Sequence, residues 1–544
     1  MRETLTPGEV LALYAPHSDT IPSLLRSRRE ARPDREALRF ERRSWTYAEL
    51  DRGSDLLAAL IAGLGVRKGD RVALIAQNSD LAIVLFLALA KSGAIFVPAN
   101  PALTDADLQY ILAHCEAKLI VAAATEVERI RAVAATLSSM PRVLDTDRLG
   151  ATEDNVAGVM QAIGALASAP PPQLEVVASD PVVVIYTSGT TGLPKGVLHS
   201  HRNHVWAGEA FVERMHLQPS DRLLTMLPLF HVNALFYSWG GALAAGGTLI
   251  TAVGFSASRL WDLAAECGAT EFNTIAAVGN ILAKRPRSEF NAAHRITKIY
   301  GGPISAEMCD VFQNEFHIPD LIEGYGMSEI PGACNNPFDG TRKLGSIGKP
   351  ARHPRLGGTF VQMKIADDEG RELPSGQLGE ILVKTPIVML GYLNDPEQTR
   401  AAFIDGWFRT GDVAWQDEDG YFYFVTRKKD IIRRRGENIS GAEIDRVLGS
   451  HPDVLEAAAI GVPAELGEEE ILAVLVARTT PPPAPEEIVK WCAQHLAAMK
   501  VPRYVVFVDA MPHSSSHRVA KFRLKEDASL LARAFDRERM RSNR

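Results

Sequence analysis

The chain has 544 residues, a length that suits several packed units rather than one compact core. Hydrophobic residues make up 46% of it and charged residues 23%, which is typical of a globular enzyme and excludes a wholly disordered protein. The net charge of −7 argues against a dedicated nucleic-acid-binding protein, because the binding surface of such a protein is basic.

The cysteine pattern and the apolar runs indicate the cellular compartment. The five cysteines are odd in number, far apart and never in a Cys-x-x-Cys pair, so we expect neither a disulfide framework nor a zinc site. The amino-terminal residues lack the basic start and apolar stretch of a signal peptide. The longest apolar run, Leu81–Ala90, is about half of the roughly twenty residues that span a membrane. We therefore expect a cytoplasmic protein that does not bind membranes.

Short apolar runs alternate with helical periodicity along most of the chain. The runs predicted to be buried strands are Arg71–Ile75, Leu119–Ala122, Val182–Tyr186, Arg222–Met226, Thr248–Thr251 and Ile296–Tyr300. The helical patterns between them include Leu81–Lys91, Arg202–Met215 and Ser258–Cys267. This alternation predicts an α/β architecture with mainly parallel sheets. The proline-rich stretch Ala169–Pro172 is a stiff connector that predicts a boundary between two such subdomains.

The pattern changes after about Pro350. Three predicted strands separated by turn-rich segments indicate a small β unit: Val361–Ala366, Gly379–Val383 and Tyr421–Val425. After Arg427 helices and strands alternate again, as Ala442–Leu448 (helix), Leu472–Val476 (strand), Glu486–Ala497 (helix) and Tyr504–Val508 (strand).

A segment rich in glycine and hydroxyl residues runs from Tyr186 to Gly196, after a predicted strand and before a helix expected to start near Ser200. Its glycines let backbone amides turn inward, and Lys195 adds positive charge, so the segment is suited to hold polyphosphate oxygens. It is not a Walker loop, because its glycines are three residues apart and Gly196 follows the lysine. A flexible surface loop is the alternative. The expected phosphate-binding residues are Thr187, Ser188, Gly189, Thr190, Thr191, Gly192 and Lys195.

Further motifs follow one another in a fixed order. They are Trp45-Thr46-Tyr47 with Glu49-Leu50, Lys91–Ala94 with Val97-Pro98, Gly301–Pro303, Gly324–Glu329, Gly391-Tyr392, Gly406–Asp412, Arg427–Ile432 and Gly436–Ile439. In these motifs the sequence resembles the adenylate-forming (AMP-binding) superfamily, which contains acyl-CoA synthetases, luciferases and peptide-synthetase adenylation domains. Among these it is most similar to the acyl-CoA synthetase branch.

The resemblance implies a fold and a domain organisation. A large N-terminal domain, residues 1–428, would consist of stacked α/β subdomains at about 1–170 and 171–350 and a small β subdomain at 351–428. A small, mobile α+β C-terminal domain, residues 429–544, would follow a hinge at Lys429.

The resemblance also implies a reaction in two halves. A carboxylate attacks the α-phosphate of ATP, which leaves an acyl-adenylate and pyrophosphate. The C-terminal domain then rotates, and a thiol attacks the activated carbonyl and releases AMP. The turn Arg435-Gly436-Glu437 would enter the site in the second half and line the pantetheine tunnel.

Roles for the nucleotide follow from the same resemblance. Glu329 would hold Mg²⁺ against the ATP phosphates, because a hard cation prefers carboxylate oxygen. Tyr325 would stack near the adenine, while Asp412 would accept hydrogen bonds from the ribose hydroxyls and Arg427 would donate to the same sugar. Taken singly, these two charged residues would be expected at the surface, and the motifs favour the functional role. The remaining nucleotide-binding residues implied by the motifs are Gly302, Gly324, Gly326, Met327 and Ser328.

His231 bears on the acceptor and on the kind of acid. It follows Phe230, where peptide-synthetase modules carry an acidic residue that pairs with the substrate amine, so an ordinary amino acid is disfavoured. Because no carrier domain follows either, free coenzyme A is the expected acceptor. In relatives this histidine resembles a gate between the acyl pocket and the thiol tunnel, and a packed structural histidine is the alternative.

The acid itself is indicated only by analogy. The expected acyl-pocket residues are Asn233, Tyr237, Ala277, Val278, Gly279, Gly302 and Gly332. Small residues among them suggest room for a bulky or branched acid. The segment Phe230–Ala234 looks most like that of ligases for crotonobetaine, alicyclic or terpenoid-type acids, which is an analogy at the level of the fold.

One departure from the family pattern concerns the first half-reaction. Where the family carries a lysine that bridges carboxylate and phosphate oxygens, the flanking Pro512 and Lys521 align Arg518. A guanidinium differs from an ammonium in shape and reach, and losing one such contact costs about 10²–10³ in rate. Arg518 could serve as a working substitute, or Lys521 could take its place. Alternatively the chain performs only the thioesterification half, with a separate partner enzyme that makes the adenylate.

The remaining expectations concern the class of protein and its assembly. A non-catalytic nucleotide- or acyl-binding protein is the alternative from another class, and it is disfavoured because Lys195, Glu329, Asp412 and Arg427 are all present. Oxidative, luciferase-like chemistry has no distinguishing feature in the sequence. Since homodimers are the commonest oligomers of soluble enzymes, a homodimer is the expected assembly.

Overall fold

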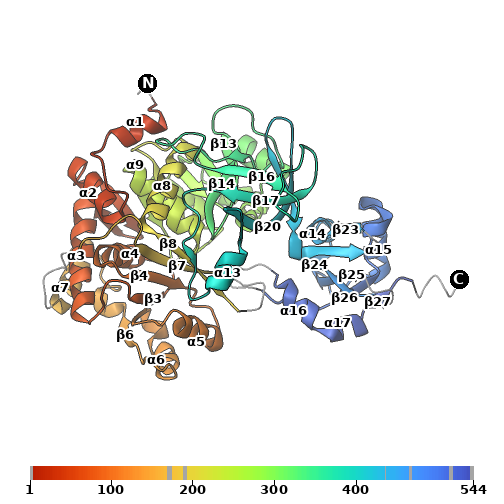
Figure 1. Cartoon of the computed structure of the whole chain (residues 1–544), viewed down its shortest axis with the longest axis horizontal. Coiled ribbons are helices and arrows are strands. Elements are labelled where there is room, and N and C mark those ends of the chain that lie inside the picture. Colours follow the sequence, from red (N-terminus) through yellow and green to blue (C-terminus); the bar gives the residue numbers. More distant parts are fainter. Residues whose placement is uncertain are drawn as a thin grey trace. The chain divides into compact units, whose positions relative to one another are not determined.

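The structure is a computed structural model of the chain. It describes residues 4–167, 174–187, 193–434, 437–464, 469–513 and 519–538, apart from the side chains of residues 437 and 438. The described residues form two compact units (Figure 1). The first unit comprises those of Met1–Thr187, Pro194–Met363 and Val383–Phe408, and the second those of Ser188–Leu193, Lys364–Leu382 and Arg409–Arg544.

The first unit contains two large sheets. The nine-stranded sheet has the order β15-β14-β13-β12-β11-β9-β10-β1-β2. Its strands are β1 (Glu36–Phe40), β2 (Arg43–Thr46), β9 (Arg222–Thr225), β10 (Thr248–Thr251), β11 (Glu271–Asn273), β12 (Lys298–Gly301), β13 (Asp320–Met327), β14 (Ile330–Asn335) and β15 (Lys349–Pro350). The seven-stranded sheet has the order β18-β8-β7-β4-β3-β5-β6. Its strands are β3 (Arg71–Ile75), β4 (Ile95–Ala99), β5 (Leu119–Ala122), β6 (Arg142–Asp145), β7 (Pro181–Thr187), β8 (Lys195–Ser200) and β18 (Gly391–Tyr392).

The strands in the middle of both sheets are parallel, and antiparallel pairs lie toward the edges. In the seven-stranded sheet β4, β3, β5 and β6 pair in parallel, whereas β7 with β8 and β8 with β18 are antiparallel. The predicted α/β fold with mainly parallel sheets is therefore confirmed.

Helices and short helical turns connect these strands. They are α1 (Pro7–Ala12), α2 (Ile21–Ala31), α3 (Tyr47–Gly63), α4 (Asp80–Ser92), α5 (Asp105–His114), η1 (Ala124–Glu126), α6 (Val127–Ala135), η2 (Asp147–Leu149), α7 (Val156–Leu166), α8 (His201–Met215), η3 (Asn233–Trp239), α9 (Gly240–Ala245), α10 (Leu260–Cys267), α11 (Ala276–Lys284), η4 (Arg287–Glu289), α12 (Ala306–Asp310), η5 (Val311–Glu315) and α13 (Pro396–Ala401).

Helix α4 follows directly from its sequence. Ser79 caps its first turn by accepting a hydrogen bond from the Ala82 amide, and Gly93, with a φ of 65°, ends it. Apart from Lys91, its side chains are buried, which explains why it is apolar all round. Lys91 donates to the carboxylate of Asp51 on α3.

Helix α8 packs closely against the segment that carries two of the predicted acyl-pocket residues. A Cβ atom on Gly208 would lie 2.4 Å from the carbonyl oxygen of Gly240, so only glycine permits this approach. Gly240 begins α9 and directly follows the π-helix η3, which contains Asn233 and Tyr237. π-Helical turns occur often at functional sites.

The helix expected to start near Ser200 is confirmed, because Ser200 caps α8, which begins at His201. The strand β8 between the phosphate loop and this helix was not predicted. β7 and β8 pair as antiparallel neighbours with Thr187 opposite Lys195, so the loop connects two strands. The strand escaped notice because His199 and Ser200 are polar although both are buried.

Five further strands form a separate sheet, and the remaining elements belong to the second unit. The five-stranded sheet contains β16 (Gln362–Ala366), β17 (Gly379–Lys384), β19 (Phe403–Ile404), β20 (Trp407–Gln416) and β21 (Phe422–Arg427). A two-stranded sheet and a four-stranded sheet follow: β22 (Ile431–Arg434) with β23 (Glu437–Ser440), then β24 (Val454–Pro463), β25 (Glu469–Ala477), β26 (Tyr504–Phe507) and β27 (Phe535–Asp536). The helices are η6 (Lys428–Asp430), α14 (Gly441–Gly449), α15 (Pro485–His495), η7 (Ala498–Lys500), α16 (Lys521–Glu526) and α17 (Ala528–Ala532).

Strand β25 explains the continuous apolar run that was predicted at Leu472–Val476. Ile471, Ala473 and Leu475 belong to one buried cluster, and the alternate residues Leu472 and Val474 belong to a second one. A strand buried on both faces is apolar at every position.

The domain boundaries inferred from the sequence stay predictions. The proposed hinge residue Lys429 lies in η6, inside the second unit. The connector at Ala169–Pro172 lies outside the described residues.

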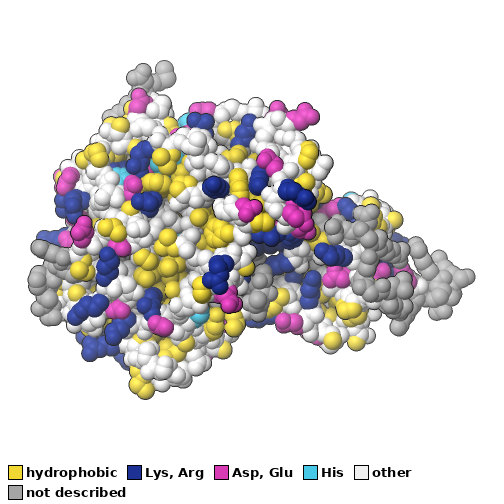
Figure 2. All heavy atoms as spheres, viewed as in Figure 1, with side chains coloured by type: hydrophobic (Ala, Val, Ile, Leu, Met, Phe, Trp, Pro, Cys, Tyr) yellow, Lys and Arg dark blue, Asp and Glu magenta, His cyan; other side chains and the backbone are white. Residues whose placement is uncertain are grey.

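On the face shown in Figure 2, Lys and Arg side chains are scattered over the surface with Asp and Glu among them. No helix within the described parts of the chain has the length and apolar character needed to cross a membrane.

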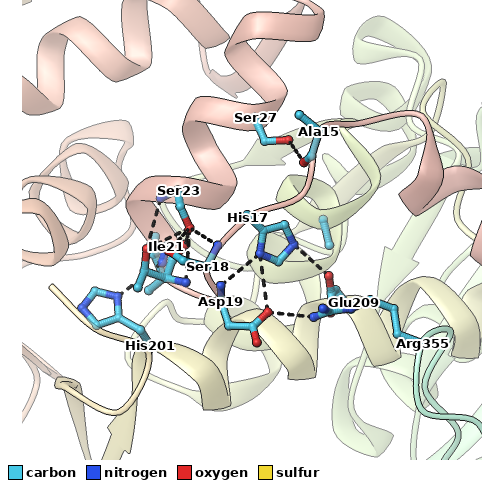
Figure 3. A network of polar contacts seen from close by, with 12 residues as sticks. Ala15, His17, Ser18, Asp19, Ile21, Ser23, Ser27, His201, Glu209 and Arg355 are labelled. Carbon is cyan, nitrogen blue, oxygen red and sulfur yellow. Dashed lines mark hydrogen bonds and ion pairs between the residues drawn. The ribbon is translucent and has the colours of Figure 1, made fainter.

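A buried carboxylate, Glu209 on α8, joins the N-terminal segment to a distant loop (Figure 3). It is 1% exposed and accepts hydrogen bonds from His17 Nε2 at 3.0 Å and from Arg355 Nη2 at 2.6 Å. His353 Nε2 lies 3.0 Å from the same carboxylate. Burial alone would raise the pKa of Glu209, but these partners hold it well below its ordinary value of 4.5.

The Glu209→Gln variant should lower the free energy of unfolding by about 2 kcal/mol at about pH 7, because hydrogen bonds to a charged acceptor are lost. Since the folded-state pKa is depressed, the wild-type contribution is complete above about pH 4.5 and is lost as the pH falls further. Denaturant unfolding at several pH values should therefore show the two proteins converging in acid.

Glu213→Gln on the same helix is the matched control. Glu213 lies 3.5 Å from an arginine, Arg352, that is 67% exposed, so its removal should change stability by less than about 1 kcal/mol. A difference between wild type and Glu209→Gln that stays constant down to about pH 3 would contradict the proposed role of the charge.

Candidate active site

The edge of the seven-stranded sheet brings the phosphate-loop lysine to an aromatic ring. Lys195 is the first residue of β8, and β18 pairs with β8 so that Tyr392 lies opposite Val197. The Lys195 ammonium lies 5.1 Å from the centroid of the Tyr392 ring, which is cation–π distance. The pairing of β8 with β18 thus fixes the position of the Lys195 backbone relative to Tyr392.

Glu329 contacts the hydroxyl of the same tyrosine. Tyr392 donates its hydroxyl hydrogen to Glu329 Oε1 at 2.8 Å, and the Met389 amide donates to the Glu329 carbonyl at 2.8 Å. Glu329 is 8% exposed. The predicted phosphate-binding cation and the predicted metal-binding carboxylate are therefore joined through one residue, for which the sequence suggested no role.

Two buried residues support the backbone next to Glu329. His199 donates from Nε2 to the Ser328 carbonyl at 2.7 Å, while Asn203 donates to His199 Nδ1 at 3.0 Å and to the Val388 carbonyl at 2.9 Å. Burial lowers the pKa of His199 to about 4, so the imidazole is neutral and the network assigns the hydrogen to Nε2. No pattern in the sequence had pointed to this pair.

The glycine motifs predicted to contact the nucleotide lie on neighbouring strands. β12 and β13 are parallel, with Gly301 opposite Glu323, and a Cβ atom on Gly302 would lie 2.8 Å from the Gly324 carbonyl oxygen. Tyr325 is half-buried, as are Met327 and Ser328, while Gly326 is exposed. Burial raises the pKa of Glu323 to about 7.

Two of the predicted acyl-pocket residues, Tyr237 and Gly332, share a neighbour, and a third, Asn233, is held against β11. Asn233 accepts a hydrogen bond from Asn273 Nδ2 at 2.8 Å, which holds it against β11. Tyr237 and Gly332 both lie beside Gly326: a Cβ atom on Gly326 would be 2.8 Å from the tyrosine oxygen and 2.7 Å from the Gly332 nitrogen.

The other predicted pocket residues lie on α11. Val278 and Gly279 are buried there, whereas Ala277 is exposed. A Cβ atom on Gly279 would lie 2.6 Å from Met308 Sδ, so this glycine makes room for a protein side chain.

His231 lies where the chain enters the π-helix. Its amide donates to the Pro228 carbonyl at 3.0 Å, its carbonyl accepts from the Leu235 amide at 3.1 Å, and its ring contacts that of Phe230 edge-on. It is partly buried, which fits both the predicted gate and the structural alternative.

The residues predicted to bind ribose form a pair in the second unit. Asp412 on β20 is opposite Arg427 on β21, and Arg427 Nε lies 3.0 Å from Asp412 Oδ1. The Asp412 side chain is 1% exposed and that of Arg427 is 34% exposed. The aspartate is thus not a solvated surface charge, which removes the alternative considered for it.

The described parts of the C-terminal segment contain Lys521 and Lys429. Lys521 Nζ lies 2.5 Å from Asp445 Oδ2 and donates to the Ala459 carbonyl at 3.0 Å, so it would have to break an ion pair to act in place of Arg518. Lys429 is exposed in η6. The predicted site residues that lie outside the described residues are Ser188, Gly189, Thr190, Thr191, Gly192, Arg435, Gly436 and Arg518, together with the side chain of Glu437.

Two surface pockets occur in the second unit, of about 480 and 660 Å³. Both are lined by residues between Arg434 and Glu538, and neither contains a predicted site residue. The volume of a pocket alone therefore does not locate the predicted site residues in this chain.

Comparison with known proteins identifies the family. The family model described as AMP-binding enzyme matches residues 25–393, and the model for the AMP-binding enzyme C-terminal domain matches residues 443–518. The chain belongs to the AMP-binding enzyme family. The predicted superfamily is therefore confirmed, and so is its acyl-CoA ligase branch, because the relatives below are CoA ligases.

Relatives of this AMP-binding enzyme match over almost their whole length. Sulfoacetate–CoA ligase from Cupriavidus necator is 34% identical over 523 residues, 94% of this chain and 98% of the relative. Long-chain-fatty-acid–CoA ligase FadD13 from Mycobacterium tuberculosis is 34% identical over 488 residues, which cover 89% and 93% of the two chains.

Solved structures agree with the fold of this AMP-binding enzyme. ATP-bound MatB from Rhodopseudomonas palustris superimposes with a TM-score of 0.79 at 28% identity, covering 96% of this chain and 99% of that one. The Bacillus subtilis o-succinylbenzoate CoA synthetase in complex with its acyl-adenylate gives 0.79 at 27% identity, covering 92% and 97%.

If Glu329 holds Mg²⁺ as the sequence predicts, the Tyr392→Phe variant should bind ATP with Mg²⁺ about five- to tenfold more weakly, because the substitution removes the hydrogen bond from Tyr392 to the Glu329 carboxylate. The substitution leaves the aromatic ring beside Lys195 in place. Isothermal titration calorimetry measures the affinity. Tyr423→Phe is the control, since the hydroxyl of Tyr423 donates to Asp417 instead and its loss should leave the affinity unchanged. Equal affinities for Tyr392→Phe and wild type would show that Glu329 needs no such support.

Proposed function

We propose that the chain is an AMP-forming acid–thiol ligase. It converts a carboxylic acid and ATP into an acyl-adenylate and pyrophosphate, and then converts the adenylate and coenzyme A into an acyl-CoA thioester and AMP. The observation that carries this proposal is the cluster of Lys195, Tyr392 and Glu329, in which a cation and a carboxylate contact the same tyrosine at the end of the phosphate loop.

The roles in the first half-reaction follow from charge and hydrogen-bonding capacity. Lys195 contacts phosphate oxygens, and Glu329 is the residue that would hold Mg²⁺. The fit is good because Mg²⁺ is bound in proteins by one or two carboxylates together with substrate phosphates. This also agrees with the described residues, which offer no cluster of three His, Cys, Asp or Glu side chains that could bind a metal by themselves. When bound, Mg²⁺ neutralises charge on the phosphate oxygens.

The sugar and the base are held by other residues. Asp412 accepts hydrogen bonds from the ribose hydroxyls and Arg427, its ion-pair partner, donates to the same sugar. Tyr325 stacks on the adenine beside the glycines of β12 and β13. A buried carboxylate has few competing solvent partners, which favours Asp412 as a sugar ligand.

The second half-reaction uses coenzyme A. After rotation about Lys429, the segment Arg435-Gly436-Glu437 lines the path of the pantetheine arm, and His231 separates this path from the acyl pocket. Such a rotation lets one cleft present different groups to two successive transition states.

The acid we propose is bulky, alicyclic or terpenoid-like, on the resemblance of Phe230–Ala234. The relatives do not identify this acid, because the acids in their names include sulfoacetate, long-chain fatty acids and 2-succinylbenzoate. Part of the space that small residues leave is taken up by protein, since Met308 fills the place beside Gly279. A homodimer in the cytoplasm is the proposed assembly and location.

A second candidate function rests on Arg518. With arginine in place of the lysine that serves only adenylation, the chain would perform thioesterification alone on an adenylate from a separate partner enzyme. Lys521 is a poor replacement, because it is committed to Asp445.

The deciding experiment compares two inputs in the presence of coenzyme A. One receives a panel of bulky acids with ATP and Mg²⁺, and the other receives the matching preformed acyl-adenylates. We expect AMP, pyrophosphate and thioester from the first, all measured by mass spectrometry. Thioester from the adenylates alone would support the second candidate function, and no product from either input would refute both.

The Arg518→Lys variant separates the two half-reactions. If Arg518 limits adenylation, the variant should form pyrophosphate about 10²-fold faster and should load coenzyme A from the adenylate at an unchanged rate. Arg523→Lys, in α16, is the control and should change neither rate. A variant that speeds both half-reactions equally would contradict a role confined to adenylation.

A further inference from the structure

A buried arginine lies against residues predicted to line the acyl pocket. Arg214, in the last turn of α8, is 3% exposed. Its guanidinium carbon lies 5.2 Å from the ring centroid of Tyr300, 5.3 Å from that of Tyr237 and 5.7 Å from that of Phe211. The three rings shield the cation from water on the sides that they cover.

The acceptors around Arg214 are neutral and leave part of its hydrogen-bonding capacity unused. Nε donates to Asn335 Oδ1 at 3.0 Å, while Nη2 and Nη1 make long contacts to the Gly332 carbonyl at 3.3 Å and to the Tyr300 hydroxyl at 3.5 Å. A guanidinium has five N–H groups. Two of those on the terminal nitrogens therefore have no acceptor among the described residues.

Arg214 also lacks a counter-charge, since no carboxylate in the described parts of the chain lies within 4.0 Å of it. Other buried arginines are paired: Arg43 with Asp80 at 2.6 Å and Arg434 with Glu470 at 2.7 Å. Arg28, which is buried without a carboxylate, donates instead to the Ala244 carbonyl at the negative end of α9. A buried charge without a partner is costly, so its presence suggests that a ligand supplies the partner.

The neighbours of Arg214 indicate which ligand would supply the missing partner. A Cβ atom on Gly332 would lie 2.2 Å from Arg214 Nη2, so the absence of a side chain at this position lets the guanidinium reach the backbone of the predicted pocket wall. Tyr237, a second predicted pocket residue, stacks on the same guanidinium.

We propose that Arg214 binds a second anionic group, a carboxylate or a sulfonate, at the end of the acid that is distal to the reacting carboxylate. The inference rests on the proposed ligase function and narrows its substrate class. A guanidinium offers a planar pair of donors that matches either anion. Burial raises the pKa values of Tyr237 and Tyr300, so both hydroxyls stay protonated and are available as donors as well.

The test uses pairs of acids that differ only at the distal end. Each anionic acid is matched with an analogue that carries a methyl group there: adipate with hexanoate, cyclohexane-1,4-dicarboxylate with 4-methylcyclohexanecarboxylate, and 4-sulfobenzoate with 4-methylbenzoate. Wild type, Arg214→Gln, Arg214→Lys and the control Arg202→Gln are compared, since Arg202 is an exposed arginine on the same helix. The readouts are kcat and KM for AMP release, from acid or preformed adenylate, and thermal stabilisation by each acid without turnover.

We expect wild type and Arg202→Gln to prefer the anionic member of at least one pair. In Arg214→Gln, kcat/KM for that member should fall about 100-fold, mainly through KM, because one partner of a buried charge pair is removed. The methyl analogue should change by less than about threefold, and Arg214→Lys should retain part of the preference. The pair that responds distinguishes a carboxylate from a sulfonate.

Two results would overturn the inference: a wild-type preference for the methyl analogues, or an equal loss for both members of a pair in Arg214→Gln, which is what a purely structural arginine predicts. If no acid or adenylate gives any product, the ligase function itself fails. The thermal stabilisation measured without turnover then still tests the role of Arg214. If Arg214 binds the distal anion, the anionic acids should stabilise wild type more than Arg214→Gln.

Discussion

The pairing of β18 with β8 is the contact on which the phosphate end of the site depends. β18 has two residues and comes from a part of the chain far from β8, yet its register brings Tyr392 into contact with both Lys195 and Glu329. The antiparallel β7–β8 pair is the other half of this constraint, because it sets where the lysine leaves the loop. Backbone hydrogen bonds at a sheet edge thus determine the positions of side chains that carry opposite charges.

Sequence patterns predicted several core strands and missed others, among them β8. The strands Arg71–Ile75, Leu119–Ala122 and Thr248–Thr251 lie where their apolar runs indicated, since central parallel strands are apolar on both faces. β8 was missed because it buries the polar residues His199 and Ser200, whose burial depends on partners elsewhere in the chain. A local pattern contains no information about such partners.

The same limit applies to the site. Motifs indicated Glu329, Asp412 and Lys195, and the structure gives each of them a specific partner. It also adds Tyr392, which had been noticed only as part of a motif, and Asn203, which had not been noticed at all. Arg214 lies in the predicted helix Arg202–Met215, and the sequence assigned it no role. It is distinguished by the three rings around it and by the lack of a carboxylate within 4.0 Å among the described residues.

The close approach of Arg214 to Gly332 makes these two positions interdependent. A methyl group on residue 332 would occupy the place of a guanidinium nitrogen, so a larger residue there requires a shorter one at 214. Shortening residue 214 alone would leave a void, which is also unfavourable. The two substitutions should therefore be strongly non-additive in stability, because each single change is destabilising. If Arg214 recognises the substrate as proposed, a change of specificity here requires both residues to be varied at once.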